Sequence, residues 1–283
     1  MRIFRTKHKS NASYCNKGSV LLFTLMVMIG LTSVVGAYLG FVRYSTKSTG
    51  AQITDSQAVY LAEAGLQKAI WNLMRTAANG GQGENWTTAG TTENLGEGGY
   101  TMVVERWDWA LAANDATVSS DDSAVGQPAT NANDGDDVTY WESDAKPQGP
   151  RPKSLTIAFP YALTINKVRF LAPTSDNRPR DYKWQVSTDG SIYADAFDEV
   201  SGNGSADVTD TFPEQSNVTH MRLIVTKAGQ PSSTVMVSTV EAIGSKITVT
   251  GTVGGNSRVI EETVAVDDAS EEAYDQIDWK END

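Results

Sequence analysis

One short segment of the sequence gathers residue types that bind hard metal ions. It spans residues 131–141 and reads NANDGDDVTYW. Four of its side chains offer oxygen donors close together in the chain: Asp134, Asp136, Asp137 and Thr139. Hard cations such as Ca²⁺ take six to eight oxygen ligands, and Gly135 permits a tight turn among these donors. The segment is therefore a candidate calcium loop, and the alternative is a turn rich in Asp and Asn that binds nothing.

The rest of the sequence offers little material for catalysis. The chain has two His, at positions 8 and 220, and one Cys, at position 15, too few for a His-based triad or a multi-Cys metal cage. The neighbouring acids Glu261 and Glu262 fall on opposite faces of a strand, so they cannot flank one bond as a catalytic pair. The net charge of −12 argues against binding to phosphate backbones. We therefore predict that the protein is not an enzyme and does not bind nucleic acid.

The N-terminus has the pattern of a membrane segment. Residues 1–18 carry five basic residues and no acid, and residues 19–42 carry no charge at all. An uncharged run of this length can cross a bilayer as a helix, and the preceding basic residues place 1–18 in the cytoplasm. A cleaved secretory signal is the competing interpretation, but the apolar run continues to Val42, beyond a usual signal.

The helix is expected to continue past the membrane segment. Small and apolar residues recur at helical spacing on one face: Ala58, Leu61, Ala62, Gly65, Leu66, Ala69, Ile70 and Leu73. This spacing predicts an amphipathic stripe. The first helix-stopping signal is at residues 79–81, so we predict one nearly continuous helix over about 19–78.

Two features of this N-terminal region resemble minor pilins. Lys17-Gly18 directly before the apolar run resembles a prepilin leader, and residues 58–73 (AVYLAEAGLQKAIWNL) resemble the PilX and GspK types. The resemblance implies that prepilin peptidase cuts after Gly18, that Ser19 becomes an N-methylated terminus, and that the helix binds other pilins. It further implies an inner-membrane stage followed by an extracellular filament. Major pilins have Glu at the fifth mature position; Phe23 stands there instead, as in subunits at a filament tip.

The composition changes again in the middle of the chain. All nine Pro lie between Pro128 and Pro231, where short runs with alternating apolar residues predict an antiparallel sandwich or barrel. The flanking strands around 100–104, 247–253 and 258–266 resemble a pilin sheet, with a hairpin turn at 254–256. We therefore expect an α+β fold, in which a long N-terminal pilin helix packs on a small antiparallel sheet and an all-β jelly-roll domain is inserted. The expected parts are a leader (1–18), the helix (19–79), the sheet region (80–110 and 245–266), the inserted domain (111–244) and a solvated, mobile acidic tail (267–283).

The inserted segment resembles the discoidin, or coagulation-factor C-type, domain. The matching pieces are the 131–141 loop, Arg180-Asp-Tyr182, Val186-Ser-Thr-Asp-Gly190, Met221-Arg-Leu-Ile-Val225 and Val240-Glu-Ala-Ile-Gly244. The resemblance implies a jelly roll with a structural Ca²⁺ held by the 131–141 loop and an acid near the closing strand. The implied ligands are Asn133, through its backbone, Asp134, Asp136, Thr139 and Glu241.

The same resemblance implies glycan binding by loops at one end of the barrel. The candidate loops are 175–179 and 227–231, and the candidate ligand-binding residues are Asn177, Arg178 and Lys227. Trp141 and Trp184 are predicted to be core residues and not stacking platforms for a sugar. Trp107 and Trp109 are predicted to pack at the domain junction.

These inferences converge on a minor type IV pilin that displays a discoidin-like domain for adhesion to glycans or other surface molecules. Three alternatives remain open at the level of sequence. In the first, the chain is a minor pseudopilin of a type II secretion system that contacts cargo. In the second, it is an unprocessed membrane-anchored sugar-binding protein, and in the third, an enzyme accessory module.

Overall fold

The computed structural model describes residues 17–148, 150–265 and 276–282. The chain divides into two compact units, Met1–Thr54 and Asp55–Asp283, which are described separately. Helix α1 (Lys17–Met74) begins in the first unit and ends in the second. The expected leader lies outside the described residues except for Lys17 and Gly18, which begin α1 with Ser19.

The first unit contains the apolar half of α1. Its large apolar side chains between Val20 and Tyr44 are exposed. The helix is long and apolar enough to cross a membrane, as the sequence predicted, although a signal sequence has the same properties. This part of α1 is therefore a candidate membrane-spanning segment.

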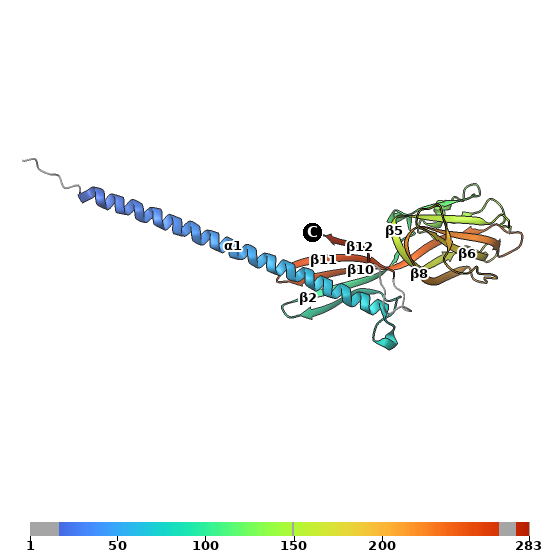
Figure 1. Ribbon diagram of the computed structural model, residues 1–283, viewed down its shortest axis with the longest axis horizontal. Helices are drawn as coiled ribbons and strands as arrows, with labels where there is room; N and C mark the ends of the chain where they lie inside the picture. The colour runs from blue at the N-terminus through green and yellow to red at the C-terminus, as the bar shows by residue number, and fades with distance from the viewer. Residues whose placement is uncertain (1–16, 149, 266–275, 283) are drawn as a thin grey trace, which may run out of the picture. The chain divides into compact units, whose positions relative to one another are not determined.

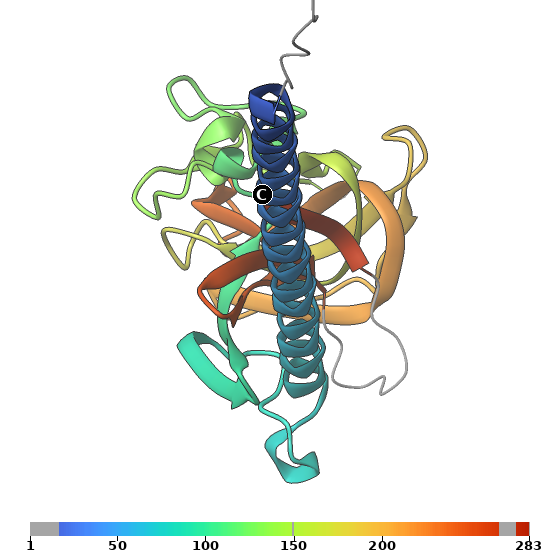
Figure 2. The same ribbon diagram turned by 90° about the vertical axis from the view of Figure 1, so that its left-hand side faces the viewer.

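In the second unit, the remainder of α1 packs on an antiparallel sheet (Figures 1 and 2). The sheet has the order β1-β2-β10-β11-β12. Its strands are β1 (Thr88–Leu95), β2 (Gly98–Asp108), β10 (Thr239–Val253), β11 (Asn256–Val264) and β12 (Gln276–Asn282). Gly254 and Gly255 form the predicted β10–β11 turn, both with positive φ, as this tight turn requires.

The predicted helical stripe forms the contact with the sheet. Seven of its eight residues are buried and Leu61 is half-buried, so the prediction is confirmed. The stripe meets apolar side chains from β2, β10 and β11, including Met102, Val249 and Ile260. The helix and sheet lie so close that a Cβ at Gly65 would come within 2.6 Å of Val249 Cγ1. This close approach accounts for the Ala and Gly residues that make up half of the stripe.

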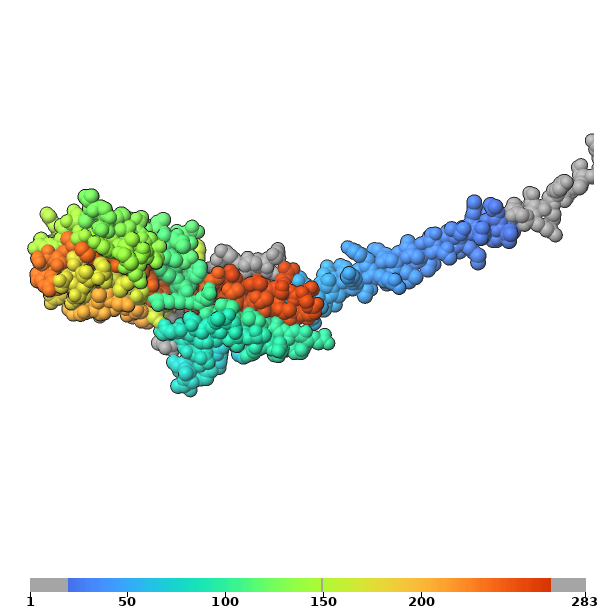
Figure 3. All heavy atoms as spheres, turned by 180° about the vertical axis from the view of Figure 1, so that it is seen from behind, coloured from blue at the N-terminus to red at the C-terminus, as the bar shows by residue number. Residues whose placement is uncertain are grey.

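The atoms of the inserted segment form one compact body, coloured green to orange in Figure 3. This body is a jelly roll built on two long, bent strands. They are β5 (Lys153–Leu171) and β8 (Asp207–Ala228), and each contributes to both layers. One layer adds β3 (Thr117–Ser120), β6 (Pro179–Ser187) and β7 (Ala194–Asp195), and the other adds the first residues of β10. The short strands β4 (Trp141–Glu142) and β9 (Met236–Val237) form a separate pair. The short 3₁₀ helices are η1 (Ala77–Asn79), η2 (Ala112–Asn114) and η3 (Ala129–Ala132).

Strand β10 belongs to both parts of the second unit. Its first residues pair with β5 of the jelly roll, and residues from Ile243 onward pair with β2. Asp108 ends β2 at this junction, and its Oδ1 accepts N–H bonds from Ala110 (2.8 Å) and Ala242 (2.9 Å). Burial raises the pKa of Asp108 to about 7 despite these two bonds.

The structure differs from the sequence prediction at both edges of the sheet. Strand β1 was not expected, because its sequence, TAGTTENL, lacks an apolar alternation. Part of the expected mobile tail, Gln276–Asn282, forms β12 against the free edge of β11, which offers unpaired backbone groups. The remaining tail residues, 267–275 and 283, lie outside the described part of the chain, as does residue 266 of the expected sheet region.

Candidate functional site

Several loops meet at one end of the jelly roll, where β5 and β6 begin and β8 ends. These segments are 121–128, 142–152 (without residue 149, which lies outside the described part), 172–178 and 227–235, and we refer to them as the loop end. They are linked to one another by backbone bonds, such as Ala124 N–H to Glu142 O (2.8 Å) and Gln230 N–H to Asp176 O (2.9 Å). The loops are therefore fixed relative to one another before any ligand binds.

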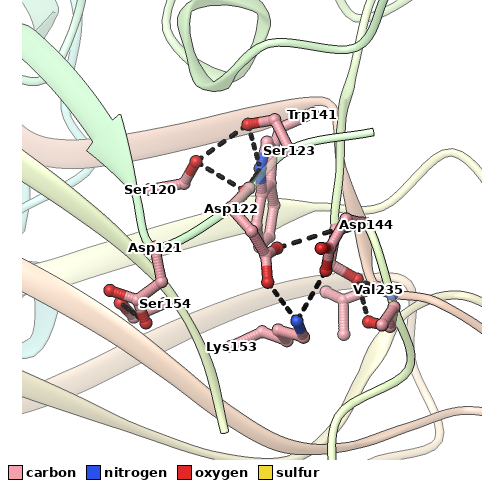
Figure 4. Close-up of polar contacts among 11 residues, drawn as sticks. Ser120, Asp121, Asp122, Ser123, Trp141, Asp144, Lys153, Ser154 and Val235 are labelled. Carbon is pink, nitrogen blue, oxygen red and sulfur yellow. Dashed lines mark hydrogen bonds and ion pairs between the residues drawn. The ribbon is translucent and has the colours of Figure 1, made fainter. Parts of the chain in front are cut away.

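Lys153 joins two of these loops from below (Figure 4). Its ammonium group donates to Asp144 Oδ1 (2.8 Å) and to Asp122 Oδ2. Burial lowers the pKa of Lys153, but the bonds to these two carboxylates outweigh that effect, so its pKa is raised overall. The bond from Lys153 is the main cause of a lowered pKa at Asp144. Lys153 is thus a buried cation that holds two anionic loops together.

Trp141 and Ser154 complete this network. The Trp141 indole N–H donates to Asp122 O (3.0 Å) and Ser123 Oγ (3.1 Å), and Ser154 Oγ donates to Asp121 Oδ2 (2.6 Å). Trp141 is fully buried, so the prediction that it is a core residue is confirmed, as it is for Trp184. Sequence analysis missed Lys153 and its partners because no local motif joins charges so far apart in the chain.

The predicted sugar-binding residues all lie at the loop end, but each has intramolecular partners. Asn177 Nδ2 donates to Thr234 O (3.0 Å) and Thr234 Oγ1 (3.1 Å). Arg178 Nε donates to Asn203 O (3.0 Å), and a second Arg178 nitrogen bonds to Ser175 O. These contacts hold the loops and compete with contacts to a ligand.

Lys227 is the most accessible of the three predicted residues. Its side chain is 64% exposed and pairs with the buried carboxylate of Asp181. Burial alone would raise the pKa of Asp181, but the bonds from Lys227 and from Gly202 N–H (2.8 Å) lower it overall. An ionised Asp181 therefore anchors a lysine that remains open to solvent.

The 131–141 loop brings three predicted calcium ligands together. Thr139 Oγ1 donates to Asp134 Oδ2 (2.7 Å) and lies 3.0 Å from Asp136 O, while Asp136 N–H donates to Asp134 Oδ1 (2.9 Å). Oxygen atoms of these kinds are the ligands that Ca²⁺ takes, and here they form hydrogen bonds within the same loop. The Asn133 carbonyl, by contrast, accepts a bond from Ala112 N–H (2.8 Å).

Glu241, the fifth predicted ligand, forms ion pairs with two arginines outside the 131–141 loop. One carboxylate oxygen bonds to Arg169 (2.9 Å) and the other to Arg106. Asp207 also pairs with Arg169 (2.7 Å), so a ladder of alternating charges crosses from β8 to β2. Among the described residues, no group of three or more His, Cys, Asp or Glu side chains is placed to hold a metal ion. The calcium site remains a prediction, and the arginine contacts do not favour Glu241 as a ligand.

The two tryptophans near the junction pack inward. Trp109 is buried in the jelly-roll core, and Trp107 is partly buried against it. The Lys246 ammonium lies 5.2 Å from the Trp107 ring centroid. The prediction that this pair packs at the junction is confirmed.

Comparison with known proteins assigns the inserted segment. Residues 115–240 match the family model of the F5/8 type C domain. A mutant form of chitosan-binding module 1, from a chitosanase/glucanase of Paenibacillus sp. IK-5, is similar at 21% identity, with a TM-score of 0.43 over 50% of this chain and 100% of that one. The module CpGH89CBM32-5 from Clostridium perfringens, in complex with GalNAc-β-1,3-galactose, is similar at 20% identity, with a TM-score of 0.41 over 47% and 98%.

A third similar structure is the family 32 carbohydrate-binding module of C. perfringens NanJ in complex with galactose. Its identity is 16%, and its TM-score is 0.41 over 49% of this chain and 99% of that one. No curated protein matches the sequence. Residues 115–240 are therefore similar to the F5/8 type C domain.

Proposed function

We propose that this chain is a minor pilin that displays a carbohydrate-binding F5/8 type C domain on a type IV pilus or related filament. The observation that carries the proposal is that the two ends of α1 have different surroundings. The half over residues 20–44 exposes apolar side chains, whereas the half from Ala58 to Leu73 packs on the sheet that bears the inserted domain. One helix therefore serves both as an anchor and as the core of a folded head.

Processing and assembly follow from the exposed half of the helix. Cleavage by prepilin peptidase after Gly18 would leave Ser19 as the terminus of an apolar helix. That helix would reside in the inner membrane before assembly and bind other pilins in the filament. Once the helix has left the lipid, burial against other subunits would keep its apolar side chains out of water and so stabilise the filament.

Glycan recognition is assigned to the loop end. Its loops are cross-linked through Lys153, Thr234 and Asn177, so little conformational entropy is lost when a ligand binds. Lys227 offers an exposed ammonium donor for sugar hydroxyls beside the fixed Asp181 carboxylate. Asn177 and Arg178 would hold the 172–178 loop in place. Those of their side-chain N–H groups that are not bonded within the protein would donate to the sugar.

A glycan array tests this assignment with the full chain in a detergent without a sugar headgroup. We expect binding to a defined set of glycans, and loss of about tenfold in affinity for Lys227→Ala, the usual effect of removing one charged hydrogen bond. Lys183→Ala is the matched control, because Lys183 pairs with Asp195 on the sheet face (3.0 Å). An array with no bound glycan, or equal losses in both variants, would contradict sugar binding at the loop end.

A further inference from the structure

A cavity lies at the opposite end of the jelly roll from the loop end. It has a volume of about 340 Å³ and lies between the β6–β7 turn and the bend of β8 around residues 215–218. Strand β6 begins at the loop end with Pro179 and finishes at this cavity with Ser187. None of the residues predicted to bind sugar lines it.

The lining combines aliphatic and polar groups. Val186 and Val218 are buried and form an apolar wall, and Ile192 stands beside them with 77% of its surface exposed. Ser216 and Gln215 add polar side chains from β8. Sugar rings present C–H groups on their faces and hydroxyls at their edges, so they suit a pocket with a mixed lining of this kind.

Asp189 gives the cavity a fixed anionic acceptor. Its Oδ1 accepts bonds from the backbone N–H groups of Ile192 (2.9 Å) and Ser191 (2.8 Å) and from Ser187 Oγ (3.0 Å). The backbone bonds, led by that from Ile192, lower the pKa of Asp189. All of these bonds end on Oδ1, and none of the described residues donates to Oδ2, which is therefore available to accept hydroxyl or ammonium donors.

The walls of the cavity are held in place before a ligand arrives. The β6–β7 turn is closed by the Asp189 bonds, and Gly190 has φ +73 and sits so near His220 that a Cβ would lie 2.7 Å from its ring. Gln215 Nε2 donates to Pro213 O (2.9 Å), which fixes the side chain and leaves its Oε1 as a further acceptor. A preformed pocket loses less entropy on binding than a mobile one.

The charge of the lining residues limits which ligands the cavity can bind. The nine lining residues include Asp189 and no Lys, Arg or His, so a carboxylated sugar would meet repulsion without a compensating cation. We propose that this cavity is a second saccharide-binding site, which takes a neutral or amino-sugar ring and rejects sialic and uronic acids. This site is independent of the loop end and goes beyond the function proposed above.

Methyl NMR on the full chain tests the proposal, with Ile192 as a reporter inside the site. The detergent carries no sugar headgroup, the Ile192 signal is assigned with Ile192→Val, and the probes are methyl β-D-galactopyranoside, D-glucosamine and D-glucuronate. We expect the Ile192 methyl signal to shift to saturation with at least one of the first two sugars and not with glucuronate. No Ile192 shift with either sugar, or equal binding of glucuronate, would overturn the proposal.

Two variants locate the binding. Ser216→Phe fills the cavity and should weaken the Ile192 response by about tenfold or more, whereas Ser201→Phe, another exposed serine, should leave it unchanged. Lys227→Ala should also leave it unchanged, which separates this site from the loop end. If Lys227→Ala removes the Ile192 response, the sugar binds at the loop end and the proposal of a second site is refuted. The function proposed above would not be affected by that result. If Ser216→Phe fails to fold, the wild-type titration still decides the proposal.

Discussion

The two parts of the second unit are stabilised in opposite ways. The helix–sheet part relies on small apolar residues in close contact, as at Gly65 against Val249 and Gly251 against Ala58. The loop end of the F5/8 type C domain relies instead on charges, with Lys153 buried between Asp122 and Asp144. A packed helix needs shape complementarity, whereas loops without a core of their own need specific polar links.

This difference suits the two proposed roles. Where Gly and Ala bring the helix and the sheet backbones close together, the helix has little room to shift against the sheet. Ion pairs at the loop end hold exposed backbone in one arrangement while leaving its outer surface polar. The comparison predicts that the two regions fail under different substitutions.

Gly251→Ala should have the largest effect. A Cβ at this position would lie 2.0 Å from the Ala58 carbonyl oxygen, so the helix must move away from β10. We expect a loss of about 3 kcal/mol in the free energy of unfolding, the upper end of the usual cost of overpacking. Urea denaturation of the full chain measures it, with Gly204→Ala as control because its Cβ would meet open space. Similar stability of the two variants would refute close helix–sheet packing.

Lys153→Met should cause the second-largest loss of stability, and it should destabilise the loop end. Removing the ammonium leaves Asp122 and Asp144 facing each other, and breaking such a buried pair costs about 3 kcal/mol, reduced here because Asp144 is half exposed. Lys183→Met is the control, since exposed pairs contribute about 0–1 kcal/mol. Thermal melts should separate the variants, and an unchanged melting temperature for Lys153→Met would show that the loops do not depend on this lysine.

Asp108 should make the junction between the two parts sensitive to pH. Burial raises its folded pKa from 3.8 to about 7, so the folded state binds a proton more tightly than the unfolded state. Stability from this group is therefore present at low pH and is lost as pH rises through about 7, by an amount of the order of 2 kcal/mol. Urea denaturation at pH 5 and pH 8 should show a smaller pH dependence in Asp108→Asn than in the wild type.

The buried Glu262 must be taken into account in that measurement. Burial also raises its pKa to about 7, so part of the wild-type pH dependence belongs to Glu262. The difference between wild type and Asp108→Asn isolates the junction. Equal pH dependence in the two proteins would rule out a role for Asp108.

Calcium should have the smallest effect and should act on the inserted domain. If the 131–141 loop binds Ca²⁺, a tenfold excess over its dissociation constant adds about 1.4 kcal/mol of stability. We expect the melting temperature to rise with Ca²⁺ and fall with chelator, and we expect Asp134→Asn to abolish both changes. An unchanged melting temperature in the wild type would remove the calcium prediction.

The sequence predicted the elements better than the contacts among them. The helix, its buried stripe and the 254–256 turn could be predicted because periodicity and glycine pairs are local signals. Two of the short alternating runs in the middle of the chain, 155–159 and 165–170, do not show by themselves that they belong to one strand. The structure joins them in β5, a bent strand that contributes to both layers of the jelly roll.

The sites were harder to predict than the fold. Asn177 and Arg178 were correctly expected in a loop at the end of the jelly roll, but their hydrogen bonds to Thr234 and Asn203 depend on tertiary structure. The same is true of Lys153, whose partners lie 9 and 31 residues away. Residue type indicates which chemistry is available, and only the fold shows which groups are already paired.

Mass spectrometry of the N-terminal peptide tests the central claim most directly. Sheared surface filaments and the membrane fraction would be compared for the first peptide of the chain. The account predicts a peptide that begins at Ser19, carries an N-methyl group and occurs in the filament fraction. An intact terminus at Met1, confined to the membrane fraction, would contradict the pilin assignment and leave a membrane-anchored protein with an F5/8 type C domain.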